Sequence, residues 1–475
     1  MWKKIESWIH THETAFWVCI IVSILRIPSL FEPYWYGDEA IYLTIGQALR
    51  KGEWLYRDIF DHKPPIIYWL SAAVDGNLFW FKLLGIVICI LTIIGFYQLL
   101  KRLNISKIGV HLLVFGLLIT LPTIEGNIVN AELLFLLPVV WAFFLGIKPT
   151  NSKNVLLAGI LFGLATLIKV PAIFEAAALG GYWLISRQKG IFKNGVLLAL
   201  GIIIPIAASF GYFYTQGLAQ DYLKYAWTYN LSYTATWKSN SVFDNLWVKF
   251  IIVLAIFVFS WWKSRKLSEV ARLVSVWIPI SLFAAMLSNR PYPHYLIQAA
   301  TGVSLATVLI WKSKREKLWG IFLGLLLMVT IWHYKFGFYP TFPYYSNFIS
   351  FVTKTESKDE YFRRFDTTLI FDYKIAEIIA KDTNKYDRIF VWGDRPTIYA
   401  LSRRSPIGHY TTKFHIQSLH TEDETISAIA TGRVKYIVTM GEENKLPGLW
   451  EILLSKYMKV WENGDEKVYK LWKKF

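Results

Sequence analysis

The sequence is poor in cysteine and lacks the motifs of most soluble enzymes. Its only two cysteines, Cys19 and Cys89, lie inside apolar runs, so neither a disulfide framework nor a cysteine metal site is indicated. We find no Walker A loop, no G-x-G-x-x-G turn after a strand and no H-E-x-x-H. These absences argue against a nucleotide-sugar enzyme of the Rossmann type. Internal repeats and low-complexity segments are also lacking.

Acidic residues are scarce relative to basic ones: 34 Asp and Glu face 51 Lys and Arg, for a formal net charge of +17. Clustered Lys and Arg are what a nucleic-acid-binding surface requires. Here, however, the cations occur in short groups at the ends of apolar runs, as topology signals of membrane proteins do. We therefore expect no nucleic-acid partner.

Hydrophobic residues dominate the chain, at 54%, and aromatic residues alone make up 17%. They form repeated runs of about 16–22 residues with almost no charge, which is the length a helix needs to cross a hydrocarbon core of roughly 30 Å. The pattern predicts a polytopic α-helical membrane protein surrounded by lipid, with about eleven spans. The predicted spans are 14–30, 79–100, 108–122, 131–147, 154–169, 171–186, 194–214, 246–262, 271–288, 294–311 and 318–334.

The loops between these spans predict the orientation of the chain. If the spans alternate, the Lys- and Arg-rich loops all fall on one side, which the positive-inside rule makes cytoplasmic. The N-terminus is then cytoplasmic, and an odd number of spans places the C-terminus outside. No small-residue cleavage motif follows the first run at Phe31-Glu32-Pro33, so we expect a retained helix. This describes a multi-pass protein of a plasma (inner) membrane.

The chain divides into a membrane domain at 1–334, an aromatic and Pro-containing linker at 335–350, and a small extracytoplasmic α/β domain at 351–475. The sequence pattern of that domain predicts strands at 387–392, 434–439 and 468–472 and helices at 376–380 and 397–401.

The first outer loop, residues 31–78, is too long to be a simple connector. Within it, Asp38 to Arg50 has helical periodicity and ends at Lys51-Gly52, a typical C-cap. We expect an amphipathic helix that lies along the membrane surface.

Two motifs in this loop carry groups suited to chemistry. Asp38-Glu39 follows Tyr34-Trp35-Tyr36-Gly37, and a carboxylate there could deprotonate a hydroxyl or hold a divalent ion. Alternatively, acids simply favour the first turn of a helix. In His62-Lys63-Pro64-Pro65, Lys63 suits a phosphate and His62 a metal or a proton. A polar turn before an interfacial helix is the alternative for this motif.

Further ionisable groups lie at the outer ends of other spans. Glu125 and Glu132 flank the second outer loop, and Lys169 ends the fifth span just before Pro171. Ionisable groups at membrane depth are costly and therefore suggest function, although a lysine can also extend to the headgroups. By topology these groups reach the same side of the membrane as the first loop, together with Arg290, Tyr292, His294 and Tyr295.

These residues resemble the polytopic GT-C glycosyltransferases, specifically the bacterial dolichyl-phosphate-mannose–protein mannosyltransferase-like family (family 39), which includes the aminoarabinose transferases of lipid A. The resemblance covers nearly the whole chain. It rests on Gly37-Asp38-Glu39, Tyr56-Arg57-Asp58, His62-Lys63-Pro64-Pro65, Tyr68-Trp69-Leu70, Asn130-Ala131-Glu132, Gly159 to Pro171, Arg290 to Gln298, Val391-Trp392-Gly393 and Tyr399 to Ser402.

The resemblance implies an inverting transfer of a sugar from a polyprenyl-phosphate donor to an acceptor hydroxyl, with no particular acceptor implied. Asp38 would be the catalytic acid–base residue, and Lys63 and Lys169 would lie near the donor phosphate. Aminoarabinose transferases usually carry Glu before Lys-Pro-Pro, where a metal binds, whereas this chain carries His62, which makes His62 a candidate ligand for a divalent ion.

Our full prediction extends this set of site residues. Glu39 joins Asp38 as a catalytic residue, and Arg290, His294 and Tyr295 join the two lysines as phosphate-binding residues. Glu132, Tyr36 and Tyr68 are assigned to the acceptor or to auxiliary roles.

A transporter or lipid flippase is the alternative function. That class predicts inverted repeats and charged residues near the bilayer midplane. Neither is present: the candidate residues lie at span ends, and a large outer domain follows the spans. An enzyme is therefore favoured.

Overall fold

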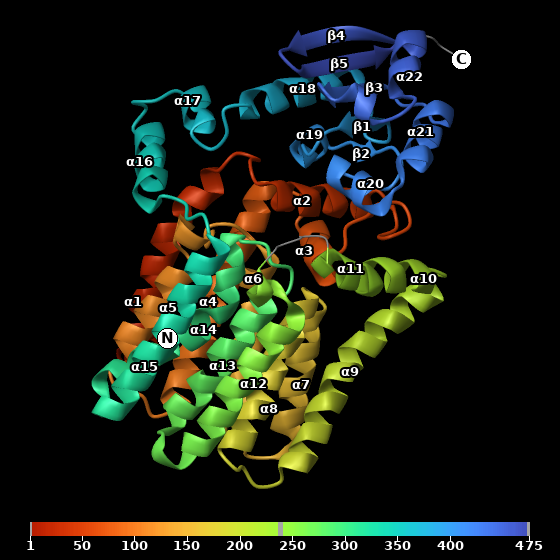
Figure 1. Cartoon of the computed structure of the whole chain (residues 1–475). Coiled ribbons are helices and arrows are strands. Elements are labelled where there is room, and N and C mark those ends of the chain that lie inside the picture. The colour runs from red at the N-terminus through yellow and green to blue at the C-terminus, as the bar shows by residue number, and fades with distance from the viewer. Residues whose placement is uncertain (1, 236–240, 473–475) are drawn as a thin grey trace. The chain divides into compact units, whose positions relative to one another are not determined.

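The computed structural model describes residues 2–235 and 241–472 and is mainly helical (Figure 1). Its contacts define two compact units. The first comprises Met1–Ser29, Lys82–Ala219 and Trp227–Tyr344, and the second Leu30–Phe81, Gln220–Ala226 and Tyr345–Phe475. The first outer loop thus groups with the C-terminal part of the chain, and the two units are described separately below.

The first unit is a helical bundle. Its helices are α1 (Trp2–Arg26), α4 (Leu78–Arg102), α5 (Ile108–Leu118), α6 (Ala131–Gly146), α7 (Ser152–Thr166), α8 (Ile173–Ile185), α9 (Ile191–Thr215), α11 (Tyr229–Ala235), α12 (Leu246–Lys263), α13 (Glu269–Ala285), α14 (Ala300–Ala306) and α15 (Lys314–Tyr334). The short helix α10 (Ala219–Tyr222), which follows α9 in the chain, belongs to the second unit from Gln220 on. The 3₁₀ helices η3 (Val170–Ala172) and η7 (Pro293–Ala299) precede α8 and α14.

A helix is found at each of the eleven predicted spans, but the helices differ in length. Among the described residues, six are long and apolar enough to cross a membrane, and four more are apolar but shorter. The remaining predicted span corresponds to α13, which is in neither group. Large apolar side chains are exposed along α9, α12 and α15, as lipid-facing helices require. The chain is a multi-pass helical membrane protein.

Close helix packing explains the glycines of the Gly159–Pro171 motif. Helices α7 and α9 lie side by side (Figure 1), and a Cβ on Gly159 would meet the carbonyl oxygen of Leu198 at 2.3 Å. A Cβ on Gly201 would meet the carbonyl oxygen of Leu156 at the same distance. Small residues let membrane helices approach to backbone contact, so these glycines have a packing role.

The second unit contains a five-stranded mixed sheet of order β2-β1-β3-β5-β4. The strands β2 and β3 run parallel to β1, and β5 and β4 continue the sheet antiparallel. The bounds are β1 (Arg388–Trp392), β2 (Ser405–Pro406), β3 (Tyr436–Met440), β4 (Tyr457–Asn463) and β5 (Glu466–Leu471).

Helices complete this unit: α2 (Gly37–Arg50), α3 (Ile66–Ala73), α16 (Thr341–Val352), α17 (Lys358–Arg363), α18 (Leu369–Asp382), α19 (Pro396–Ser402), α20 (Lys413–Leu419), α21 (Glu422–Thr431) and α22 (Leu449–Lys456). One hydrophobic core joins the sheet to α18 and α19 through residues such as Ile379, Val391 and Ile398. The three predicted strands and both predicted helices of this region are present. Part of the predicted linker is helical, as α16.

The helix predicted from Asp38 to Arg50 forms as α2 and ends where expected, with Lys51 as C-cap and Gly52 at φ 92°, a conformation that favours glycine. It is not a helix with one buried face, however, because every residue from Glu39 to Ala48 is buried. Gln47 Nε2 donates to the carbonyl oxygen of Ala400 at 3.0 Å. The helix that carries Asp38 therefore packs against α19.

Candidate functional site

Asp38 and Glu39 open α2 but have different surroundings. The side chain of Asp38 is 37% exposed, whereas Glu39 is buried at 3%. The Tyr42 hydroxyl, one helical turn later, donates to Oδ2 of Asp38 at 3.0 Å. Tyr36 precedes the helix in an extended conformation as its N-cap. Of the two predicted catalytic carboxylates, only that of Asp38 is open to solvent.

Lys63 joins two carboxylates. Its Nζ lies 3.5 Å from Oδ2 of Asp38 and 3.4 Å from Oδ2 of Asp61, and it sits 5.0 Å from the centre of the Tyr42 ring. The Tyr56 hydroxyl donates to the carbonyl oxygen of Lys63 at 2.8 Å, and Pro64-Pro65 then leads into α3. The backbone on both sides of Lys63 is thus held. The two carboxylates hold its ammonium group.

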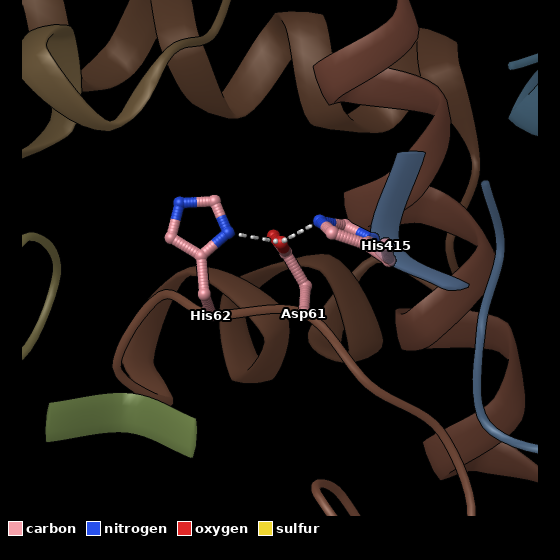
Figure 2. A group of neighbouring side chains, drawn as sticks. All are labelled: Asp61, His62 and His415. Carbon is pink, nitrogen blue, oxygen red and sulfur yellow. Dashed lines mark ion pairs between the residues drawn. The ribbon is translucent and has the colours of Figure 1, made fainter. Parts of the chain in front are cut away.

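Asp61 is the centre of a buried polar cluster that the sequence analysis did not identify. The residue is 0% exposed, and its Oδ2 accepts a 2.6 Å hydrogen bond from Tyr68. Figure 2 shows His62 and His415 on opposite sides of its carboxylate, with Oδ1 lying 2.9 Å from His62 Nδ1 and 3.6 Å from His415 Nε2. Burial alone would raise the pKa of Asp61, but the nearby Lys63 ammonium group and the hydrogen bond with His62 outweigh it and hold this pKa well below its ordinary value.

Both imidazoles of this cluster favour the neutral form. Burial lowers the pKa of His62, and it lowers the pKa of His415 to about 4, although the Asp61 carboxylate opposes both shifts. Neutral imidazoles can ligate metals. The other ring nitrogen of His415, Nδ1, lies 3.0 Å from the hydroxyl of Thr412, the kind of contact that orients a metal-binding histidine.

These residues fit a metal ion. One ligand atom from each of Asp61, His62 and His415 can be chosen so that all lie within 4.8 Å of one another. The Asp61 Oδ1 atom is buried and faces both imidazoles, 2.9 Å from His62 Nδ1 and 3.6 Å from His415 Nε2. One carboxylate and two imidazoles form a ligand set that suits Zn²⁺. His62, the predicted ligand, belongs to the group, whereas Asp61 and His415 were not predicted.

In the first unit, Glu132 and Lys169 form an ion pair. Glu132 lies in the first turn of α6, and Lys169 lies between α7 and η3, just before Pro171. The Lys169 Nζ also sits 3.9 Å from the centre of the Tyr295 ring, which comes from η7. Three predicted site residues are thus in direct contact.

The other predicted residues of the first unit have different partners. His294 Nδ1 is hydrogen-bonded to Glu125, and both side chains are buried. The guanidinium group of Arg290 lies over the Tyr233 ring, 4.1 Å from its centre. Tyr68, predicted as an acceptor or auxiliary residue, is fully buried in the Asp61 cluster of the second unit.

Known structures share this fold over nearly the whole chain. ArnT from Cupriavidus metallidurans bound to undecaprenyl phosphate aligns with a TM-score of 0.61 and 15% sequence identity, covering 96% of this chain and 97% of that chain. The apo structure of the same ArnT aligns with a TM-score of 0.59 and 14% identity, covering 97% and 98%. No curated protein sequence matches this chain.

Residues 62–213 match the model of the dolichyl-phosphate-mannose-protein mannosyltransferase family. The matched segment includes Lys63, Glu132 and Lys169. The resemblance predicted from the sequence motifs is thereby confirmed, both in this segment and in the fold of the whole chain.

Proposed function

We propose that the protein is an inverting glycosyltransferase that moves a sugar from a polyprenyl-phosphate donor to an acceptor hydroxyl on the extracytoplasmic face of the membrane. One observation carries the proposal: a partly exposed carboxylate, Asp38, is paired with a fixed cation, Lys63. A displacement on a lipid-linked sugar needs both a base for the hydroxyl and a positive charge for the phosphate. The family match over residues 62–213 and the shared fold support it.

In the proposed reaction, the acceptor oxygen bonds to the anomeric carbon as the bond from that carbon to the phosphate oxygen breaks. The electron pair of the broken bond leaves with the phosphate, and the hydroxyl proton passes to Asp38. Inversion follows from this single displacement. Glu39 is buried beside Asp38 and is assigned a supporting catalytic role.

We assign the binding of the donor phosphate to five residues: Lys63, Lys169, Arg290, His294 and Tyr295. The two lysines stand at positions of family motifs, and an ammonium group stabilises the negative charge that develops on a leaving phosphate. A role in acceptor binding, or an auxiliary role, remains assigned to Glu132, Tyr36 and Tyr68.

We further propose that Asp61, His62 and His415 hold a divalent ion, with Zn²⁺ favoured by the ligand set. When bound, such an ion supplies Lewis-acidic positive charge. The protein residues around it have defined tasks: Tyr68 orients the Asp61 carboxylate, and Thr412 orients the His415 ring.

The proposal places the protein in a bacterial plasma membrane with its N-terminus in the cytoplasm. It retains about eleven spans in residues 1–334, a linker at 335–350 and an extracytoplasmic α/β domain at 351–475. The distribution of Lys and Arg among the loops supports this orientation.

The test is turnover by the purified full-length protein in detergent or liposomes. Supplied with polyprenyl-phosphate sugars and acceptors that carry hydroxyl groups, it should release free polyprenyl phosphate and a product of inverted anomeric configuration. Movement of intact lipid-linked sugar across liposomes without cleavage of the sugar–phosphate bond would instead identify a flippase.

A further inference from the structure

A carboxyl group that the proposed reaction does not use lies inside the helical bundle. Glu175 is in the first turn of the apolar helix α8 and is 0% exposed. An ionisable side chain buried in a membrane segment is costly, and such residues are functional more often than not. No cation among the described residues pairs with it; three neutral donors surround it instead.

Those donors connect Glu175 to two other elements. Trp277 Nε1 donates to Oε2 at 2.5 Å, and the Ser281 hydroxyl donates to Oε1 at 2.9 Å. Both residues come from α13 and are four positions apart, so they lie on one face of that helix. The third donor is Gln298 Nε2, from η7, at 2.8 Å from Oε1. Glu175 therefore links α8, α13 and η7.

The link to η7 is significant because this element carries Tyr295. Seven residues are long for a 3₁₀ helix, whose hydrogen-bond geometry is poorer than that of an α-helix, so η7 depends on its contacts to keep its position. Tyr295 and Gln298 are one 3₁₀ turn apart and lie on the same side of η7.

Two contacts then attach η7 to a single neighbouring segment. Tyr295 lies against Lys169, and Gln298 binds Glu175. Glu175 follows Lys169 by six residues in the chain. Gln298 Nε2 also lies 3.4 Å from the carbonyl oxygen of Pro171, which stands between Lys169 and Glu175 in the sequence. The Glu175–Gln298 bond thus sets the register of η7 along the segment that begins at Lys169.

We propose that Glu175 is a positioning residue, which holds Tyr295 against Lys169 and so fixes the ammonium group for the donor phosphate. The inference rests on the proposed function, in which Lys169 binds that phosphate. Glu175 itself contacts no substrate. Its effect reaches Lys169 through Gln298 and η7.

The test is binding of undecaprenyl phosphate to the purified full-length protein and its variants. Glu175→Gln keeps the side-chain volume but turns an accepting oxygen into a donating amide. We expect it to weaken binding about tenfold, within the range of coupling between residues of one network, while the thermal melt stays near that of the wild type. Ser304→Ala, which removes another buried hydroxyl of the bundle, is the matched control and should bind as the wild type does.

A double-mutant cycle separates positioning from a general structural effect. If Glu175 acts through Lys169, adding Glu175→Gln to Lys169→Ala should cause no further loss of binding. Additive losses, or unchanged binding by Glu175→Gln alone, would overturn the inference. Should Glu175→Gln fail to fold, Gln298→Met replaces it, because this variant breaks only the link to η7 and leaves the bonds from α13.

The same experiment distinguishes the two levels of the proposal. Failure of the wild-type protein to bind undecaprenyl phosphate would overturn the proposed donor, and the role of Glu175 with it. Normal binding by the wild type and by both network variants would overturn the role of Glu175 alone.

Discussion

The Nζ atom of Lys63 lies 3.5 Å from Oδ2 of Asp38, so the proposed phosphate-binding residue and the proposed base form one ion pair. The same ammonium group is 3.4 Å from Asp61, and one cation therefore balances two carboxylates of unlike exposure. Asp61 is buried and fixed by its neighbours, whereas Asp38 remains reachable. A base has to be held in place and yet reach its substrate. The ion pair with Lys63 holds Asp38, and the partial exposure of Asp38 leaves its carboxylate accessible.

Replacing Asp38 by Asn should remove proton acceptance while keeping the size of the side chain. We expect the rate of sugar transfer to fall by about 10²–10⁴-fold, the usual cost of losing a general base. Glu39→Gln is the matched variant, and its effect should be milder because the next helical residue points about 100° away. Initial rates and thermal melts of both purified proteins are the measurements. Near wild-type transfer by a normally folded Asp38→Asn protein would show that our catalytic assignment is wrong.

Replacing Lys63 by Ala should weaken the binding of the donor. A hydrogen bond to a charged group typically contributes about 1–3 kcal/mol, and we expect a loss of that size in the affinity for undecaprenyl phosphate. Lys381→Ala is a suitable control, because its exposed side chain pairs only with Glu377 on the same helix in the described contacts. Equal affinities of the two variants would remove Lys63 from the phosphate site.

The metal proposal predicts a property that can be measured without any substrate. Full-length protein equilibrated with Zn²⁺ and then desalted should retain the ion, and His62→Ala and His415→Ala should each lose most of it, because three protein ligands are needed for tight binding. Elemental analysis measures the zinc that each protein retains. His409→Ala is the control, since that imidazole pairs with Glu424 at the protein surface. Retention of zinc by all three variants would exclude this ligand set.

The predicted orientation can be tested with single cysteines in a Cys19→Ser/Cys89→Ser background. Cysteines near Asp38, near Arg290 and in residues 351–475 should react in intact cells with a thiol reagent that cannot cross the membrane. One near Lys314 should react only after the cells are opened. Labelling of the Lys314 site from outside would reverse the proposed topology.

A glycine holds the helix of Asp38 close to α3. A Cβ on Gly46 would lie 2.3 Å from Ser71 Oγ and 2.8 Å from the backbone nitrogen of Ala72, so the two helices would have to move apart. We expect Gly46→Ala to destabilise the protein by about 1–3 kcal/mol, the usual cost of overpacking. Gly180→Ala meets nothing within 4 Å and should not lower the melting temperature. Melting curves of the two variants should therefore differ, and coinciding curves would contradict this packing.

Much of the fold is predictable because the signals are local. Long apolar runs mark the membrane helices, and the periodicity from Asp38 to Arg50, followed by Lys51-Gly52, marks α2 and its end. Single-sequence patterns failed where structure depends on distant partners. The strand β2 has only two residues, and β4 is an exposed edge strand with charged side chains, so neither has a strong pattern of its own.

The site was predictable in part for the same reason. The short motifs of one loop contain Asp38, His62 and Lys63, and these motifs indicate the chemical roles of the three residues. His415 has no motif and joins them only through the packing of the folded chain. Asp61 directly precedes His62, and that adjacency was the available signal for it. The burial of α2 from Glu39 to Ala48 was also unpredictable, because its second covering surface, α19, lies far along the sequence.

The distance in sequence between Asp61 and His415 has a consequence for biosynthesis. A ribosome-bound chain can insert its apolar helices as they emerge, but α19 is made long after α2, because Gln47 and its partner Ala400 are 353 positions apart, and His415 follows later still. Until then α2 lacks its partner helix, and the candidate metal ligands are incomplete. A chain terminated before α19 would reach the membrane, yet it would lack one of the three candidate metal ligands and would leave apolar side chains of α2 uncovered, a state open to degradation.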